Sequence, residues 1–562
     1  MGRILLTDNL KDEKFVTVSS LDKVFPKDGP KILQSKASTM KNETFHFQAS
    51  FYSDRIIIGN IQCISDLSEY ITIRAVESIP AHFAKYEGLH DDYVIEEHGS
   101  GELFPDLLRP VYTDYECMRQ KSWKTYWITV DGSKGLPVGT HEIVLRLDEY
   151  KWGTDESSGN VYECKFTLEV IDDELPNMDD FLYTGWMHYD CICYQHKVEP
   201  YTDAFYKLLG AYVDSAVKHG MTMLYTPLFT PSLDTKIGTY RRNVQLVDVE
   251  VLADGTYKFG FEKAAYFMDF ALAHGVKHFE LCHIASQWGA KKAIGVYGKV
   301  NGKEERIFGW QTDADSPEYL AFLDSFFCAF SKFVEEKGYG DKLYFHISDE
   351  PQPNALERFQ IIKNTFSKYF PNAEVMDALS DGEFSRSGII TKPFVCLSHY
   401  KENSSAWVYY CGCQRDNYLT NRHLAMPSQR NRIFGAQLYR NGCKGFLHWG
   451  FNFYNTGGSR YPIDPYLITD AGGCFDGGDP FIVYPAENGV NESLRHEVLG
   501  DAFADFRALR LLEKYVGREE TIRFLDDEGV KLGFSEYPRD AQWHHEFRFR
   551  LNEKIKKAKE NS

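Results

Sequence analysis

Two different hydrophobic rhythms divide the chain. Up to about residue 175, short segments rich in β-branched and aromatic residues are separated by Gly, Asp and Ser turns. Strand-like examples are 45–49, 55–59, 70–74, 142–147 and 161–171. Short strands with regular turn signals are typical of all-β domains, so the pattern predicts a β-sandwich over residues 1–175. A linker is expected over residues 172–177.

From residue 176 onward, strand-like runs alternate with helix-like runs, which is typical of βα units around a parallel sheet. Eight runs are predicted to be strands: 182–189, 221–229, 276–284, 342–349, 372–379, 394–400, 407–413 and 445–454. Eight such units predict a (β/α)8 TIM-type barrel over residues 176–515.

Helix signals lie between several of these strands. One helix begins near Asp203 and ends at Gly220, and another ends at Gly275. A third begins at Ser316, an N-cap residue followed by proline, and ends at Gly338. The fifth and sixth helices of the barrel look vestigial.

The C-terminal part of the chain reads as helical and polar. A helix from 492 to about 512 is expected to close the barrel, and residues 516–562 are expected to form a small appendage. A length of 562 residues exceeds what one hydrophobic core usually supports, so a multidomain protein is expected.

The charge balance narrows the range of partners. A net charge of −18 and a pI near 5.5 argue against nucleic-acid binding. No apolar run is long enough to span a bilayer, and the N-terminus lacks the apolar region of a signal peptide. We therefore expect a cytoplasmic protein, or a secreted one if a leader has been trimmed away. The sequence carries no signal for an oligomeric state.

The twelve cysteines show no C-x-x-C spacing. Two C-x-C pairs occur, Cys191/Cys193 and Cys411/Cys413, but a metal site would need further ligands close by. We interpret the cysteines as reduced, mostly buried thiols and expect neither a metal nor a cofactor.

The most informative stretch is 343–351 (LYFHISDEP), an apolar strand that runs into Asp349 and Glu350 before Pro351. In a (β/α)8 barrel the C-terminal ends of the strands carry the chemistry. Paired carboxyl groups at that place suggest cleavage of a glycosidic bond. Acidic pairs are common in a chain with 81 Asp and Glu residues, so the position of this pair gives it its weight.

The other predicted strand ends carry polar and aromatic side chains that could orient hydroxyls and stack on sugar rings. Each one alone is equally well explained as a core or rim residue. The residues expected to bind substrate are His188, Trp288, His399, Tyr409, Trp449 and Asn452.

Adjacent acids raise a geometric problem, because neighbours in a regular strand point to opposite faces. The break before Pro351 could relax this rule. Even so, neighbours lie too close together to flank a sugar from opposite sides. A mechanism with both acids on one side fits better: one protonates the glycosidic oxygen, and the other assists a 2-acetamido group that replaces the enzyme nucleophile.

At these residues the chain resembles glycoside hydrolase family 123, the β-N-acetylgalactosaminidases. The likeness lies in 346–351 (HISDEP), in 445–452 (GFLHWGFN) and in 479–485 (DPFIVYP) with the helix that follows. The resemblance implies a β-sandwich followed by a (β/α)8 barrel. It also implies that Asp349 orients and polarises the acetamido group, while Glu350 is the acid/base.

The leading hypothesis is therefore a retaining, exo-acting glycosidase that releases β-linked N-acetylgalactosamine through an oxazolinium-type intermediate. The expected partner is a glycan that contains this sugar. One alternative is a β-hexosaminidase or another glycosidase with a different sugar preference. Another is a catalytically inactive barrel that binds carbohydrate.

Overall fold

The computed structural model describes residues 13–112, 115–379, 388–401, 407–526 and 532–561. The chain forms two compact units. The first comprises Met1–Asn177, Leu424–Arg440 and Asn491–Ser562, and the second comprises Met178–His423 and Asn441–Val490. The polypeptide therefore leaves the first unit twice and returns to it twice. The domain boundaries expected at residues 175 and 515 stay a prediction.

Two five-stranded sheets form the β part of the first unit. One has the order β1-β3-β8-β5-β6 and is antiparallel throughout. The other has the order β2-β10-β9-β4-β7, with β2 and β10 as a parallel pair. The strands are β1 Lys14–Ser19, β2 Lys36–Met40, β3 Phe45–Ser53, β4 Ile57–Ile64, β5 Ile71–Ala81, β6 Glu102–Pro110, β7 Glu116–Met118, β8 Ser122–Val130, β9 Gly139–Tyr150 and β10 Ser157–Ile171.

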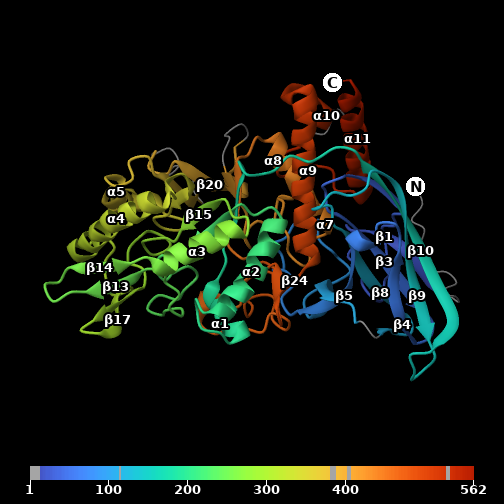
Figure 1. The fold of residues 1–562 in the computed structure, drawn as a ribbon, viewed down its shortest axis with the longest axis horizontal. Helices are drawn as coiled ribbons and strands as arrows, with labels where there is room; N and C mark the ends of the chain where they lie inside the picture. The colour runs from blue at the N-terminus through green and yellow to red at the C-terminus, as the bar shows by residue number, and fades with distance from the viewer. Residues whose placement is uncertain (1–12, 113–114, 380–387, 402–406, 527–531, 562) are drawn as a thin grey trace. The chain divides into compact units, whose positions relative to one another are not determined.

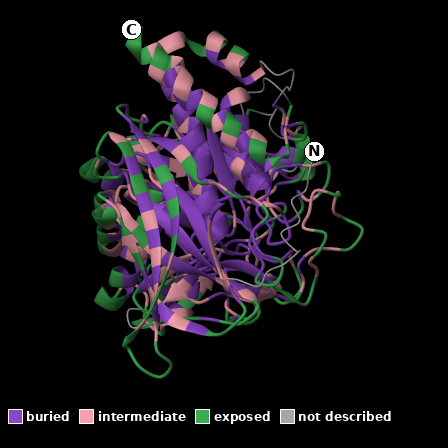
Figure 2. Cartoon of the chain, turned by 90° about the vertical axis from the view of Figure 1, so that its right-hand side faces the viewer, coloured by how far each residue is buried: buried purple, intermediate pink, exposed green. Residues whose placement is uncertain are grey.

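The two sheets share one apolar core. Buried and more exposed residues alternate along β9 and β10, as the two-residue period of a half-buried strand requires (Figure 2). Phe47 of β3 stacks on Phe166 of β10 with ring centroids 4.1 Å apart, and Tyr126 and Leu145 belong to the same buried cluster. Because inward side chains of both sheets interdigitate, this region is the predicted β-sandwich.

Helices from later in the chain complete the first unit: α7 Ser428–Arg432, α8 Phe434–Arg440, α9 Leu494–Val516, α10 Arg518–Asp526 and α11 Ala541–Glu560. The hydroxyl of Ser493 accepts the N–H of His496 and starts α9, the helix expected at 492–512. Helix α9 packs against α7, α8, α10 and α11. A Cβ at Gly435 of α8 would lie 1.7 Å from the carbonyl oxygen of Ala502, so glycine permits this close approach.

The second unit contains a closed, parallel barrel in the order β11-β12-β15-β18-β19-β20-β21-β22. Its eight strands are those predicted, each shorter than the run from which it was predicted. Pairing of β22 with β11 closes the ring. The strands are β11 Leu182–Gly185, β12 Met223–Thr226, β15 His278–Leu281, β18 Leu343–Phe345, β19 Glu374–Leu379, β20 Lys392–Cys396, β21 Trp407–Tyr409 and β22 Gly445–His448.

Helices of the second unit begin and end where the capping signals predicted. Thr202 accepts the N–H of Phe205 at the start of α2, and Ser316 accepts the N–H of Tyr319 at the start of α4. Gly338 ends α4 in a left-handed conformation (φ 71°). These helices are α1 Tyr189–His196, α2 Asp203–Lys218, α3 Glu262–Ala273, α4 Pro317–Lys337 and α5 Leu356–Ser367, with α4 beside α5 (Figure 1). The predictions for the fifth and sixth helices fall largely on 380–387 and 402–406, outside the described residues.

Two small sheets lie between the barrel elements and were not predicted. One has the order β14-β13-β16-β17, and the other pairs β23 with β24. Their bounds are β13 Asp248–Val251, β14 Tyr257–Gly260, β16 Val296–Val300, β17 Lys303–Phe308, β23 Val483–Ala486 and β24 Gly489–Glu492. Among the described residues, no helix is long and apolar enough to cross a membrane.

Candidate active site

The acid pair lies in the loop that follows β18. The strand ends at Phe345, four residues before the end of the predicted run 342–349, and both Asp349 and Glu350 are half-buried. Glu350 has a φ of 43°, in the left-handed region that non-glycine residues rarely adopt. This turn of the backbone, immediately before Pro351, breaks the strand alternation. The two neighbouring acids are therefore freed from pointing to opposite faces of a strand.

The loop that follows β15 holds the acid pair in place. The backbone N–H of Trp288 donates to the carbonyl oxygen of Asp349 at 2.9 Å. One residue earlier, the Ser348 hydroxyl donates to the carbonyl of Ser286 at 2.7 Å. Trp288 itself has a φ of 60°, and its side chain is 52% exposed. The backbone of Trp288 is thus joined to that of Asp349, and the exposed residue is available for a sugar face to stack on its indole.

The two acids influence each other electrostatically. Burial, and then the negative charges of Glu350 and Asp377, raise the pKa of Asp349 well above its ordinary value, and His346 opposes this shift. Like charges this close cannot both ionise freely, so the pair retains a proton at a pH at which isolated carboxyl groups have lost theirs. A retained proton is what a general acid requires.

Tyr409, at the end of β21, contacts the second acid directly. Its hydroxyl donates to Glu350 Oε1 at 2.5 Å. Burial and the charge of Glu350 raise the pKa of Tyr409, which keeps the phenol a neutral donor. Among the described residues expected to bind substrate, Tyr409 is the one whose side chain is hydrogen-bonded to a carboxyl group of the acid pair, and it fixes the orientation of the Glu350 carboxyl.

A charged histidine lies one layer below the pair. His346 Nδ1 is 2.6 Å from Asp377 Oδ1, and Nε2 is 2.6 Å from Glu280 Oε1. Burial disfavours the imidazolium, but the two carboxylates dominate and raise the pKa of His346 to about 9. Trp186 Nε1 donates to Glu280 at 2.6 Å. Sequence reasoning missed Glu280, although an acid inside an otherwise buried strand was a usable signal.

A second histidine stacks on the first one. The rings of His283 and His346 lie 4.1 Å apart, and burial lowers the pKa of His283 well below its ordinary value. The potential ligand atoms of His283, His346 and Asp377 lie within 4.8 Å of one another, so these residues could hold a metal ion. Both ring nitrogens of His346 already meet carboxylates at hydrogen-bond distance, which favours an imidazolium over a metal ligand.

His188 and Asn452, both expected to bind substrate, are buried against each other. Asn452 Oδ1 accepts the backbone N–H of His188 at 2.7 Å, and its amide donates to the His188 carbonyl at 3.2 Å. His188 Nδ1 accepts from Arg241 at 3.0 Å, which leaves Nε2 to donate to the Trp449 carbonyl. Burial lowers the pKa of His188 to about 3. These contacts tie the end of β11 to the end of β22.

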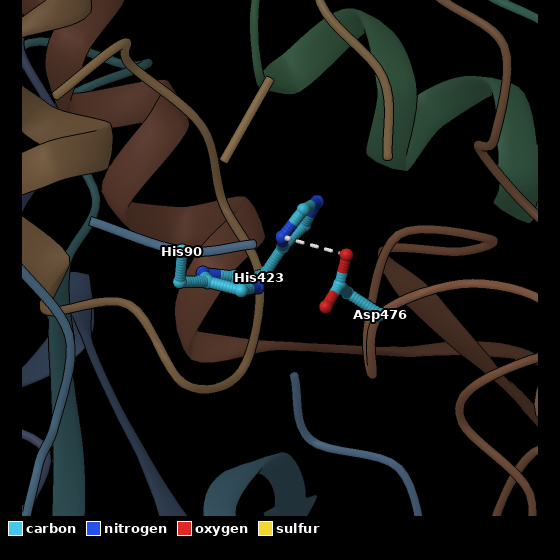
Figure 3. A group of neighbouring side chains, drawn as sticks. All are labelled: His90, His423 and Asp476. Carbon is cyan, nitrogen blue, oxygen red and sulfur yellow. Dashed lines mark ion pairs between the residues drawn. The ribbon is translucent and has the colours of Figure 1, made fainter. Parts of the chain in front are cut away.

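Trp449 is fixed by a buried anion. Its indole N–H donates to Asp479 Oδ2 at 3.0 Å. His448 and His423 approach the other oxygen of Asp479 at 3.5 and 3.7 Å and hold the pKa of Asp479 below its ordinary value against the effect of burial. The opposite nitrogen of His423 faces Asp476 at 3.8 Å, as the dashed line in Figure 3 marks. Asp479 lies in a motif that carried the family resemblance but was not expected at the site.

His399 is the least connected of the expected residues. It is exposed in a short 3-10 helix after β20, and its Nδ1 lies 3.1 Å from the hydroxyl of its neighbour Ser398. No described contact joins it to Asp349 or Glu350. Its proposed role in substrate binding stays a prediction.

Several residues with left-handed backbone lie in loops that are tied to the acid pair or to one another. Besides Glu350 and Trp288, left-handed non-glycine residues occur at Asp234, Ala290 and Ser459. The loops are tied together, because Asp234 N donates to Gln287 Oε1 at 2.7 Å and the Ser459 hydroxyl donates to the Asp234 carbonyl at 2.7 Å. Such conformations persist only where the surroundings enforce them, and they cluster at functional sites.

The cysteines take no part in disulfides among the described residues. Cys411 is intermediate in exposure and Cys413 is exposed, whereas Cys191 and Cys193 are buried. The interpretation as thiols is consistent with these positions, but only half of the twelve are buried.

A closed parallel barrel with paired carboxyl groups beyond the C-terminal end of a strand is an architecture of glycoside hydrolases. The model of the glycoside hydrolase 123 catalytic domain matches residues 186–512, and the chain belongs to this family. No curated protein matches the chain.

A solved structure of the same family agrees at the level of the fold. A family 123 glycoside hydrolase from Clostridium perfringens, described in terms of glycolipid glycan hydrolysis, superposes with a TM-score of 0.73 at 14% identity, covering 98% of both chains. A family 10 xylanase from termite gut gives a TM-score of 0.31 at 12% identity, covering 66% of this chain and 86% of the xylanase. A family 5 enzyme from Bacteroides vulgatus also gives 0.31, at 9% identity, covering 59% and 67%.

Proposed function

We propose that this glycoside hydrolase is a retaining, exo-acting β-N-acetylgalactosaminidase that works by substrate-assisted catalysis. The observation that carries the proposal is the acid pair itself. Asp349 and Glu350 are adjacent, and the left-handed φ of Glu350 releases them from strand alternation. A retaining enzyme with its own nucleophile places its two carboxyl groups roughly 5–5.5 Å apart on either side of the scissile bond, which chain neighbours do not favour.

The first step uses both acids from one side. Glu350 donates its proton to the glycosidic oxygen while the acetamido carbonyl oxygen attacks the anomeric carbon. The new C–O bond forms as the glycosidic C–O bond breaks, which yields an oxazolinium ion and a free alcohol. Asp349 accepts a hydrogen bond from the acetamido N–H and stabilises the positive charge that develops on this group.

The second step reverses the roles. Glu350, now a carboxylate, removes a proton from water, and the water oxygen attacks the anomeric carbon and opens the oxazolinium ring. Two inversions at one carbon give net retention. The raised pKa of Asp349 means that the empty site tends to keep a proton there. An acetamido N–H donor would favour the ionised form of Asp349 and leave the proton for Glu350.

The sugar preference rests on weaker support. The Clostridium perfringens enzyme with the matching fold is described as acting on glycolipid glycans, which favours a glycan substrate here. A second candidate function is a β-hexosaminidase or a glycosidase with another sugar preference. The proposed contacts of the acid pair involve the acetamido group and do not distinguish the two configurations at C4. A barrel that binds carbohydrate without cleaving it is the third.

The test is release of nitrophenol from 4-nitrophenyl β-N-acetylgalactosaminide, its gluco epimer and the β-galactoside that lacks the acetamido group. The galacto substrate should be turned over, and the β-galactoside should not. Asp349→Asn should lower kcat by roughly 10²–10⁴-fold on every acetamido substrate that is turned over. Glu350→Gln should lower it by a similar factor on a disaccharide but far less on nitrophenyl substrates, which need little protonation.

Glu357→Gln, an exposed acid in the first turn of α5, is the matched control and should keep wild-type rates. Wild-type rates in both acid-pair variants on a disaccharide would reject the assignment of Asp349 and Glu350. Preference for the gluco epimer would select the hexosaminidase. Binding of N-acetylgalactosamine without turnover would select the inactive barrel.

A further inference from the structure

The first unit contains a cavity remote in sequence from the acid pair. It has a volume of about 660 Å³, within the range of small-molecule sites. Its wall comes from the β-sandwich on one side and from α11 on the other, with single contributions from α7 and α9. Ser38, Glu43, His46, Asp501 and His544 line it, and each is more than nine-tenths buried.

The buried and half-buried charged groups of this wall are already paired, whereas Lys36 and Glu546 of the lining are exposed. His46 Nδ1 lies 2.7 Å from Asp501, whose second oxygen lies 2.7 Å from Arg432. Arg548 donates to Glu43 at 2.6 Å. A buried charge without a partner is costly, so a charged ligand would need an unpaired counter-charge. The five charged residues named in this paragraph already have partners and so offer no unpaired charge, which disfavours a charged ligand among them.

The remaining polar groups are neutral and can both donate and accept hydrogen bonds. Burial lowers the pKa of His544 to about 3, so its imidazole is uncharged, and its Nε2 has no hydrogen-bond partner among the described residues. Thr140, Thr167 and Gln542 supply hydroxyl and amide groups nearer the exposed mouth. Hydroxyl-rich ligands need this mixture of donors and acceptors.

Apolar side chains complete the wall. Leu21 and Phe45 line the cavity from the sandwich, and Leu33 and Phe549 are exposed at its mouth, 54% and 55% respectively. An exposed phenyl ring beside neutral hydrogen-bonding groups matches the two faces of a sugar ring, one apolar and one bearing hydroxyls.

We propose that this cavity is a second carbohydrate site, which binds a neutral sugar independently of the acid pair. The site is defined by binding alone, so its test is separate from that of turnover.

The experiment is saturation-transfer difference NMR and titration calorimetry on the full chain with three probes: methyl β-galactoside, lactose and galactose 6-phosphate. Thr167→Trp fills the mouth from β10 and should weaken binding of the neutral probes at this site roughly tenfold or more. Glu163→Trp is the matched control, because residue 163 lies on the same strand face but does not line the cavity. It should bind as wild type does.

Both variants should keep the wild-type melting temperature and nitrophenol release, which separates loss of sugar binding from loss of fold. If Thr167→Trp fails to fold, Gln542→Leu replaces it, because residue 542 is exposed at the mouth and its loss removes the amide alone. Unchanged neutral-sugar binding in the folded variant would overturn the proposal. So would binding of galactose 6-phosphate at the cavity in preference to the neutral probes.

Discussion

His46 in the first unit and His346 in the second are buried histidines whose two ring nitrogens each lie within 3.0 Å of a carboxylate oxygen. Among the described residues, only the carboxylates beside His46 also pair with arginines. His46 of the sandwich lies 3.0 Å from Glu497 and 2.7 Å from Asp501. Glu497 also pairs with Arg74, and Asp501 also pairs with Arg432 at 2.7 Å. In this region negative and positive groups alternate, and each carboxylate meets two cations.

His346 of the barrel has the same immediate neighbours and a different second layer. Glu280 and Asp377 both lie 2.6 Å from its ring. Among the described residues, their other hydrogen bonds come from neutral donors such as the Trp186 indole and the backbone N–H of Ile347. One cation therefore serves two anions, and burial, despite His346, raises the pKa of Asp377 to about 6.

The difference shows how one charge motif serves two purposes. Alternation in the first unit neutralises buried groups and ties the sandwich to α7 and α9. In the barrel, burial raises the pKa of Asp349, and the negative charges of Glu350 and then of Asp377 raise it further. Perturbed carboxyl groups of this kind mark functional sites, because selection for chemistry tolerates the cost in stability.

The largest expected effect comes from removing each histidine in turn. His346→Gln would leave Glu280 and Asp377 buried without a cation and should cost roughly 3–5 kcal/mol of unfolding free energy. His46→Gln should cost only about 1–2 kcal/mol, because Glu497 and Asp501 keep their arginines. Urea unfolding followed by circular dichroism measures both. Equal costs would break the comparison.

Alkaline pH should weaken both regions. The pKa of each histidine is raised to about 9 in the folded protein, above an ordinary value of 6.5, so its stabilisation is complete below pH 6.5 and disappears as pH rises through 9. Because one pKa unit corresponds to about 1.4 kcal/mol, each histidine should lose about 3 kcal/mol of its stabilising contribution over this pH range. Melting temperatures from pH 6 to 10 should fall less steeply in His46→Gln than in wild type. An unchanged slope would contradict the assigned charge on His46.

Tyr409→Phe tests whether the hydrogen bond from Tyr409 to Glu350 in the barrel contributes to activity. A hydrogen bond to a charged group is worth about 1.5–3 kcal/mol, so kcat/KM should fall roughly 10–100-fold, and more for a disaccharide than for a nitrophenyl sugar. Tyr400→Phe is the control, because its hydroxyl donates to the Asn441 carbonyl at 3.2 Å instead of to an acid. Equal losses in both variants would remove Tyr409 from the positioning of Glu350.

Asp349→Asn should be slightly more stable than wild type while it loses activity. The folded-state pKa of Asp349 is raised, so the folded protein binds more protons than the unfolded chain, and stability falls as pH rises above the ordinary carboxyl value. The asparagine side chain does not titrate, so the variant lacks this decrease with pH, and its unfolding free energy should exceed that of the wild type by about 1 kcal/mol at neutral pH. Denaturation at pH 5 and pH 8 should show the gap widening with pH. A constant gap would mean that packing, and not charge, causes it.

The sequence predicted the barrel well because apolar runs bounded by Gly and Pro identify buried strands directly. It overestimated the lengths of the strands, since an apolar run such as 343–349 does not show that the ladder ends at Phe345. Glu280 was missed because its partner, His346, directly follows a different strand, and pairing across a barrel leaves no local pattern.

The local sequence pattern also predicted only part of the geometry of the acid pair. Pro351 indicated a break, but the left-handed φ of Glu350 depends on the surrounding loops, including the hydrogen bond from Trp288 to Asp349. Similarly, the helical periodicity of 494–516 predicts α9 without showing that it packs with the sandwich unit. Contacts between segments distant in the chain decide such features.

Because the φ of Glu350 is positive, the residue type at this position should indicate whether a related protein is active. Glycine and asparagine adopt that conformation more readily than glutamate does, so the backbone itself favours their replacement of the acid. Under the proposed mechanism, selection for proton transfer by Glu350 opposes such drift. Among related chains, proteins with a glutamate at this position should hydrolyse substrate, and proteins with a glycine or asparagine should be inactive.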